Sequence, residues 1–150
     1  MHSNLRPSQV AAVVGQVSPA SQTVGTALTG WIDASQFECF LGILQSGVLG
    51  ASGTLDAKFR QATDNIGTNA KDVAATIIPQ NVVATDNNKI NLINLLQRDL
   101  DFANGFRYFA LSATVGGASS LISGVVIGMN ERFGPATMQN AGAIVKQVVN

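Results

Sequence analysis

The side chains that could serve as a nucleophile or a general base are few and widely separated. The sequence has one histidine, His2, and one cysteine, Cys39. His2 lies at the start of the chain, where chains are usually poorly ordered. Cys39 lies in a largely apolar stretch that we predict below to be a core strand, so we expect it to act as a small hydrophobe. With no histidine to activate it, we expect no catalytic residue, and a Ser–His–Asp arrangement would require His2.

The spacing of the carboxylates does not indicate a catalytic or metal site. The closest pair, Asp99 and Asp101, lies in a turn-like stretch beside Arg98, and we interpret it as a solvated loop, with acid–base work as the alternative. The chain lacks the Ca²⁺ loop of alternating acidic positions that ends in Glu. We therefore expect no metal and no cofactor. Three further aspartates show no liganding spacing: Asp64, Asp72 and Asp86.

Glycine pairs and aromatic residues also have structural explanations. Gly116 and Gly117 are not followed by the Lys-Ser/Thr helix start of a phosphate-binding loop, so they predict a turn. Four aromatic residues are of the kind that stacks on nucleic-acid bases. Because no basic groove accompanies them, core packing or a protein interface is the favoured interpretation. These residues are Trp31, Phe106, Tyr108 and Phe109.

The composition favours association with other protein chains. The 150 residues suffice for one domain with a sizeable core. Charged residues make up 12% of the chain, against roughly 25% in an average soluble domain, and nine basic side chains balance nine acidic ones. Low charge favours covered surfaces, because interface cores are depleted in charge; a weakly charged monomer is the alternative. The balance also argues against nucleic acid as a partner.

Cysteine usage and hydropathy bear on the compartment. A single cysteine allows no intrachain disulfide, which fits a reducing cytosol or an assembly that matures there. Residues 2–7 lack a charged region followed by an apolar run, so we expect no N-terminal signal. No stretch of about 18 uninterrupted apolar residues occurs, so we expect no membrane span.

Alternating apolar residues predict several strands. The clearest is Thr54–Gln61, with an apolar face of Leu55, Ala57 and Phe59 opposite a polar face. Residues 36–45 are apolar on both faces, which predicts a strand buried on both sides. One face of that strand carries Phe37, Cys39, Leu41 and Ile43, and the other carries Phe40 and Leu44.

Further strands are predicted toward the C-terminus. Residues 106–115 and 121–129 alternate and are joined by the turn at Gly116, which predicts a hairpin. Residues 89–96 fit both strand and helix periods, and we predict a strand. Residues 136–150 have helical spacing and could equally form a strand or an arm.

These patterns predict an all-β protein: a single antiparallel β-sandwich or jelly-roll-like barrel with extended N- and C-terminal arms. The expected division is an N-terminal arm at 1–30, a β-sandwich domain at 31–135 and a C-terminal tail or arm at 136–150. The apolar ends can fold back as cover or reach a neighbouring subunit. We expect that deleting residues 1–20 leaves a folded β core and weakens assembly.

The central two-thirds of the chain resembles small jelly-roll-like structural proteins of tailed-phage virions. The resemblance begins with FECFLGIL at 37–44 and GTLDAKFRQATD at 53–64. NIGTNAKDV at 65–73 stands where such proteins have a phrase like DGT-x-F-x-D-V. RYFALSATVGG at 107–117 is similar to their R-Y-V-R followed by T-x-x-G, and VVIG at 125–128 ends the pattern. The apolar N-terminal stretch and the longer C-terminal tail depart from it.

The resemblance implies a non-enzymatic virion protein that is assembled in the host cytoplasm. It implies a capsid decoration or cement protein that bridges subunits of the major capsid protein as a homo-oligomer, with a trimer allowed by symmetry. Family members of this kind also occur at the neck or the base of a head spike. A non-viral ligand-binding β-barrel or lectin-like module is the alternative from another class, and a hydrolase is the third.

Overall fold

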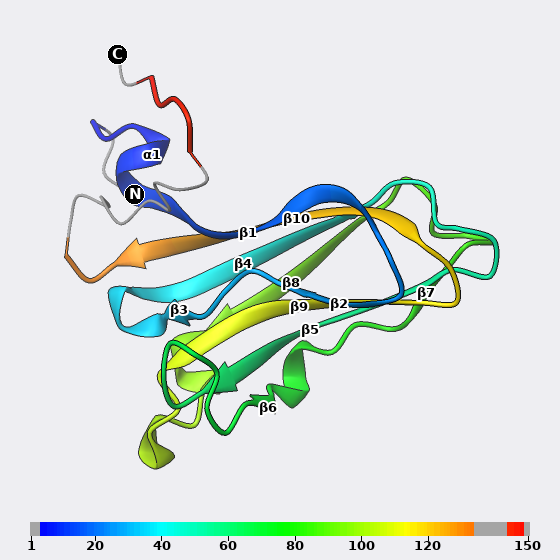
Figure 1. Cartoon of the computed structure of the whole chain (residues 1–150). Coiled ribbons are helices and arrows are strands. Elements are labelled where there is room, and N and C mark those ends of the chain that lie inside the picture. The colour runs from blue at the N-terminus through cyan, green and yellow to red at the C-terminus, as the bar shows by residue number, and fades with distance from the viewer. Residues whose placement is uncertain (1–3, 134–143, 149–150) are drawn as a thin grey trace.

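The computed structural model of the protein describes residues 4–133 and 144–148 and consists mainly of two antiparallel sheets (Figure 1). Sheet A has four strands in the order β1-β10-β4-β8. Hydrogen-bonded neighbours in sheet A are far apart in the sequence. The first long strand, β1, for example, pairs with the last strand, β10. The strands of sheet A are β1 (Ala11–Gln22), β4 (Phe37–Ser46), β8 (Ile90–Leu96) and β10 (Ser120–Glu131).

Sheet B has six strands, with the main order β2-β9-β5-β6. The short strands β3 and β7 pair with β9 and β5 at the ends of this sheet. Its strands are β2 (Gly25–Leu28), β3 (Ile32–Asp33), β5 (Thr54–Ala62), β6 (Lys71–Asp72), β7 (Asn81–Val82) and β9 (Tyr108–Gly116).

The helical elements are short connections. A single α-helical turn, α1, precedes β1, and four 3-10 turns lie between strands. None of the described helices is long and apolar enough to cross a membrane. They are α1 (Pro7–Val10), η1 (Ala34–Gln36), η2 (Ala74–Thr76), η3 (Gln97–Asp99) and η4 (Phe102–Asn104).

The long strands cross from one sheet to the other at nearly every connection. The chain runs from β1 in sheet A to β2 in sheet B, back to β4, across to β5, back to β8, across to β9, and back to β10. Two sheets linked by such crossings, with β1 and β10 paired, form a jelly roll. The prediction of an all-β sandwich is confirmed.

Phenylalanine rings fill the space between the sheets. The ring of Phe109 lies 4.4 Å from that of Phe40 and 5.5 Å from that of Phe59, measured between centroids. Phe37 adds an edge-on contact with Phe40 at 6.1 Å. Tilted and edge-on pairs at these distances are favourable beyond the apolar area that they bury. The predicted inward face of β5 is confirmed, because Leu55, Ala57 and Phe59 are all buried.

The expected N-terminal arm is wrong for residues 11–28. β1 pairs with β10 from Ala11 to Gln22, and β2 pairs with β9. Two register shifts, between Val13 and Gly15 and between Val17 and Ala20, break the alternation that would reveal a strand. Pro19 is tolerated because β1 is an edge strand.

The predicted hairpin between residues 106–115 and 121–129 is also wrong, although both strands exist. β9 belongs to sheet B and β10 to sheet A, so the turn between them joins the sheets. Gly117 is required in this turn: its φ is +71°, and an added Cβ would lie 2.0 Å from the carbonyl oxygen of Ser52. Residues 136–143, 149 and 150 of the predicted C-terminal tail lie outside the described residues.

Candidate functional site

Cys39 lies on the outer face of sheet A, whereas the sequence placed it in the core. It is half-buried, and its thiol donates to the carbonyl oxygen of Met129 at 3.5 Å. Burial and the negative charge of Glu38 both raise the pKa of the Cys39 thiol, so the reactive thiolate is disfavoured. His2 lies outside the described residues. Cys39 is therefore a half-buried side chain on the surface of sheet A, where it acts as a small hydrophobe.

The structure assigns the predicted loop carboxylates to structural roles. Asp99 accepts a hydrogen bond from the backbone N–H of Leu96 at 2.9 Å, while Asp101 forms an ion pair with Lys71 at 2.6 Å. The two carboxylates therefore serve different partners. In residues 4–133 and 144–148, no group of three or more potential metal ligands occurs.

The other predicted candidates are also separated. Asp64 accepts from the backbone N–H of Thr68, and Asp86 accepts from that of Val82. Asp72 bridges Lys58 and Arg60 on sheet B. The four aromatic residues singled out from the sequence also lie in four different surroundings. Phe109 lies in the core, the Lys71 ammonium lies 3.9 Å from the Phe106 ring centroid, Tyr108 lies on the outer face of sheet B, and the Trp31 indole lies beside Gly67.

Three aspartates tie stability to acid pH. Burial alone would raise the pKa of Asp33, but hydrogen bonds led by that of Arg107 hold it below its ordinary value of 3.8. The Lys71 hydrogen bond lowers the pKa of Asp101, and the hydrogen bonds of the 64–68 turn lower that of Asp64. A lowered folded-state pKa stabilises the protein above the unfolded-state value, and this stability is lost as the pH falls through the folded-state value.

We therefore expect the free energy of unfolding to be steady near neutral pH and to fall as the pH drops below the ordinary aspartate pKa of 3.8. Asp33→Asn should make that fall shallower, because one linked carboxylate is gone. Chemical denaturation at a series of pH values measures both slopes. Equal slopes for the variant and the unmodified protein would contradict the role of Asp33.

The outer face of sheet B is polar, as the alternation of residues 54–61 predicted. Lys58 and Asp72 form an ion pair at 2.6 Å across neighbouring strands. The hydroxyls of Thr26 and Thr114 share a hydrogen bond at 2.8 Å. Leu28 is an apolar exception, 40% exposed at the end of β2. This face has the composition of an ordinary wet surface.

The outer face of sheet A is mainly apolar, although Gln45, Asn94 and Ser123 lie on the same side, and we call its apolar part the apolar face. The register places Val125 beside Ile43 and Ile43 beside Leu92, so apolar side chains continue across β10, β4 and β8. Leu92 is 61% exposed and Ile90 is 59% exposed. Contiguous exposed apolar surface marks interaction sites more often than chance. The apolar face consists of Cys39, Leu41, Ile43, Ile90, Leu92, Leu96, Val125, Ile127 and Met129.

The prediction for residues 36–45 was therefore wrong in one respect. The strand is apolar on both faces, but Leu41 and Ile43 are only partly covered, and Phe37 is buried together with Phe40 and Leu44. A two-faced apolar strand indicates that both faces meet apolar partners. Here one of the two faces is only partly covered by the chain itself.

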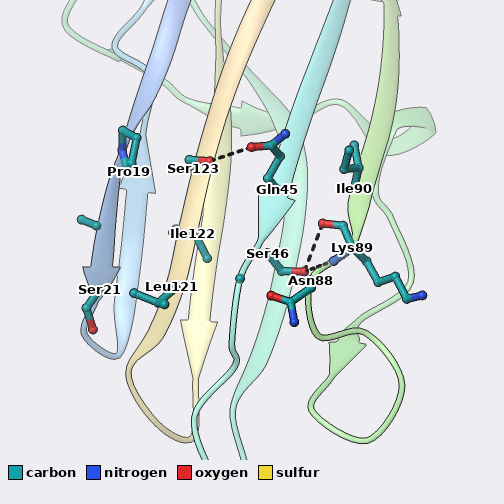
Figure 2. Close-up of a pocket in the computed structure, with 12 residues that line it drawn as sticks. Pro19, Ser21, Gln45, Ser46, Asn88, Lys89, Ile90, Leu121, Ile122 and Ser123 are labelled. Atoms are coloured by element: carbon teal, nitrogen blue, oxygen red, sulfur yellow. Dashed lines mark hydrogen bonds between the residues drawn. The ribbon is translucent and has the colours of Figure 1, made fainter.

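A shallow groove of about 590 Å³ lies at one end of the same sheet face. Pro19, Ser123, Gln45 and Ile90 cross it in a row from four neighbouring strands (Figure 2). Two of its polar side chains are engaged: Ser123 donates to Gln45 at 3.2 Å, and the Ser46 hydroxyl lies within hydrogen-bond distance of two backbone carbonyls. Asn88 and Lys89 also line the groove, so it combines apolar and polar surface.

Comparisons with known proteins give a partial likeness in structure. No protein-family model matches the chain, and no curated protein matches its sequence. The chain is similar to a solved structure described as "Structure of infectious bursal disease virus Gx strain", with a TM-score of 0.35 and 17% identity. The likeness covers 83% of this chain and 32% of that one, so the chain spans about a third of its length.

Proposed function

We propose that this chain is a non-enzymatic structural protein of a tailed-phage virion, specifically a capsid decoration or cement protein. The observation that carries the proposal is the apolar face of sheet A, which has no charged member and includes exposed isoleucine and leucine side chains. The partner that we assign to this face is a subunit of the major capsid protein. The tailed-phage assignment comes from the strand-and-turn phrases between residues 37 and 128.

The apolar face suits a protein that stabilises an assembled shell. Each Å² of apolar surface removed from water contributes roughly 25 cal/mol. A protein that binds the assembled shell better than free subunits stabilises that shell by mass action. The polar outer face of sheet B, with its ion pair between Lys58 and Asp72, would then face solvent. The contrast between the two faces supports a one-sided attachment.

Particles purified under native conditions test this proposal. Quantitative mass spectrometry should find the chain in many copies per particle. Imaging of the same particles should place it on the shell surface. If only a few copies were found, at the neck or at the base of a head spike, the chain would be a neck or spike-base protein and not a decoration protein. Absence from particles, together with saturable binding in a ligand or glycan screen, would favour a ligand-binding module.

A pair of variants tests whether the apolar face makes the contact. Ile43→Lys puts a charge in the middle of that face, so binding to particles that lack the protein should weaken about tenfold or more. Leu28→Lys makes the same kind of change on the outer face of sheet B and should bind like the unmodified chain. Circular dichroism and thermal melting confirm that both variants fold. Equal weakening by both would contradict the assignment of the face.

A further inference from the structure

β8 presents an open edge of sheet A. It is the last strand in the order β1-β10-β4-β8, and among the described strands it pairs only with β4. The backbone N–H of Ser46 donates to the carbonyl of Lys89 at 2.9 Å, so the odd-numbered residues of β8 turn their backbone groups toward β4. In an antiparallel ladder the alternate residues face the other way. Ile90, Leu92 and Asn94 therefore direct N–H and C=O groups outward.

These three outward N–H groups have no hydrogen-bond partner among the described residues. The next one, at Leu96, is capped by the Asp99 carboxylate at 2.9 Å. The turn η2 lies near β8, but the hydrogen bonds of its Thr76 go to Val73 and Phe59. The open ladder is thus centred on Leu92, with one free position on each side.

The other sheet edges carry the features that prevent pairing. β1 contains Pro19 and two register shifts. β2 spans only Gly25–Leu28, and β6 and β7 are two residues each. Short strands, proline and bulges all blunt an edge, as charged side chains do. β8 has seven residues, INLINLL, and includes no proline, no glycine and no charge.

We propose that a second copy of this chain pairs with β8, antiparallel and across a two-fold axis at Leu92. Each Leu92 would exchange both backbone hydrogen bonds with its copy, and Ile90 would lie opposite Asn94 of the second copy. The two A sheets would become one continuous sheet, and the two apolar faces one larger face. This inference rests on the proposed function and deepens it, because it names how copies join before they meet the shell.

The ends of β8 set the length of the shared ladder. The chain turns at residues 87–88 before the strand and enters η3 after it, so the pairing spans Ile90–Leu96 at most. The strand carries no charged side chain, so no like charges meet when it pairs with its own copy.

Cysteine cross-linking tests the register in the full chain. The background is Cys39→Ser, because Cys39 lies on the same sheet face. In a hydrogen-bonded antiparallel pair the two Cα atoms lie about 5.5 Å apart, which suits a disulfide. Leu92→Cys should therefore give mostly disulfide-linked dimers under mild oxidation. Ile90→Cys should stay largely monomeric, because its copy lies several residues away along the ladder. Equal cross-linking of both variants would overturn the register.

Sedimentation of the isolated chain tests the edge itself. The unmodified protein should form a dimer, while Asn94→Pro, which removes one outward N–H, should weaken it about tenfold or more. Leu92→Lys should do the same, with Leu28→Lys as the matched control. A trimer, or a dimer unaffected by both edge variants, would overturn the inference. The presence of the chain in particles is measured separately. If the dimer does not form as described, that measurement alone still decides the proposed virion role.

Discussion

Replacing Phe59 by alanine should lower the free energy of unfolding by about 3–5 kcal/mol. The Phe59 ring is fully buried on β5 and packs edge-on against Phe109 at 5.5 Å. The substitution removes the ring from the middle of the sandwich, and the tightly paired strands can close the cavity only in part. A loss of this size is a large share of the roughly 5–15 kcal/mol that stabilises a domain. Denaturant unfolding followed by circular dichroism measures it.

Arg60→Ala is the matched control, one position along the same strand. Arg60 lies on the outer face, where it forms an ion pair with Asp72 at 3.3 Å and donates to the carbonyl of Ala70. An exposed ion pair of this kind contributes about 1 kcal/mol or less. If Arg60→Ala proved the more damaging of the two, the inward and outward faces of β5 would be exchanged.

Deleting residues 1–20 should abolish cooperative folding, which reverses the expectation from the sequence. The deletion removes nearly all of β1, including the buried Ala12 and Val17. It also exposes the backbone edge of β10, which lies between β1 and β4 in the sheet. The truncated chain should show no sharp thermal transition by circular dichroism.

A synthetic peptide of residues 8–22 provides the control for this deletion. Added in excess, it should restore the β1–β10 ladder by strand addition, and with it the thermal transition. A truncated chain that melts like the full chain without the peptide would show that β1 is dispensable. The N-terminal segment would then be the detachable arm that its sequence suggests.

The sequence predicts the fold class well because alternation is a local signal. β5 could be placed from Leu55, Ala57 and Phe59 alone, since one face is buried and the other is wet. β1 could not, because its bulges and Pro19 disturb the period of two while its partner β10 lies a hundred residues away. The same distance explains the false hairpin: the turn after β9 is local, but the choice of sheet is made by long-range pairing.

The sequence does show that β4 is apolar on both faces, but it led to the wrong prediction that both faces are buried. Leu41 and Ile43 alternate with Phe40 and Leu44, and apolar residues on both faces usually indicate burial on both sides. Whether the second cover comes from the same chain or from a partner depends on the complete fold. Which side chains of β8 are exposed could not be predicted for another reason. The sequence INLINLL fits the helical and strand periods equally, so it does not define a single buried face.

Hydroxyl-radical footprinting of native particles compares the two faces of the sandwich in one experiment. The chain should attach through the apolar face of sheet A and leave the outer face of sheet B in water. Met129, Ile43 and Leu92 should be oxidised in the free chain and protected in particles, while Tyr108 and Leu28 should react equally in both. Protection of Tyr108 and Leu28, with Met129, Ile43 and Leu92 still reactive, would contradict the account.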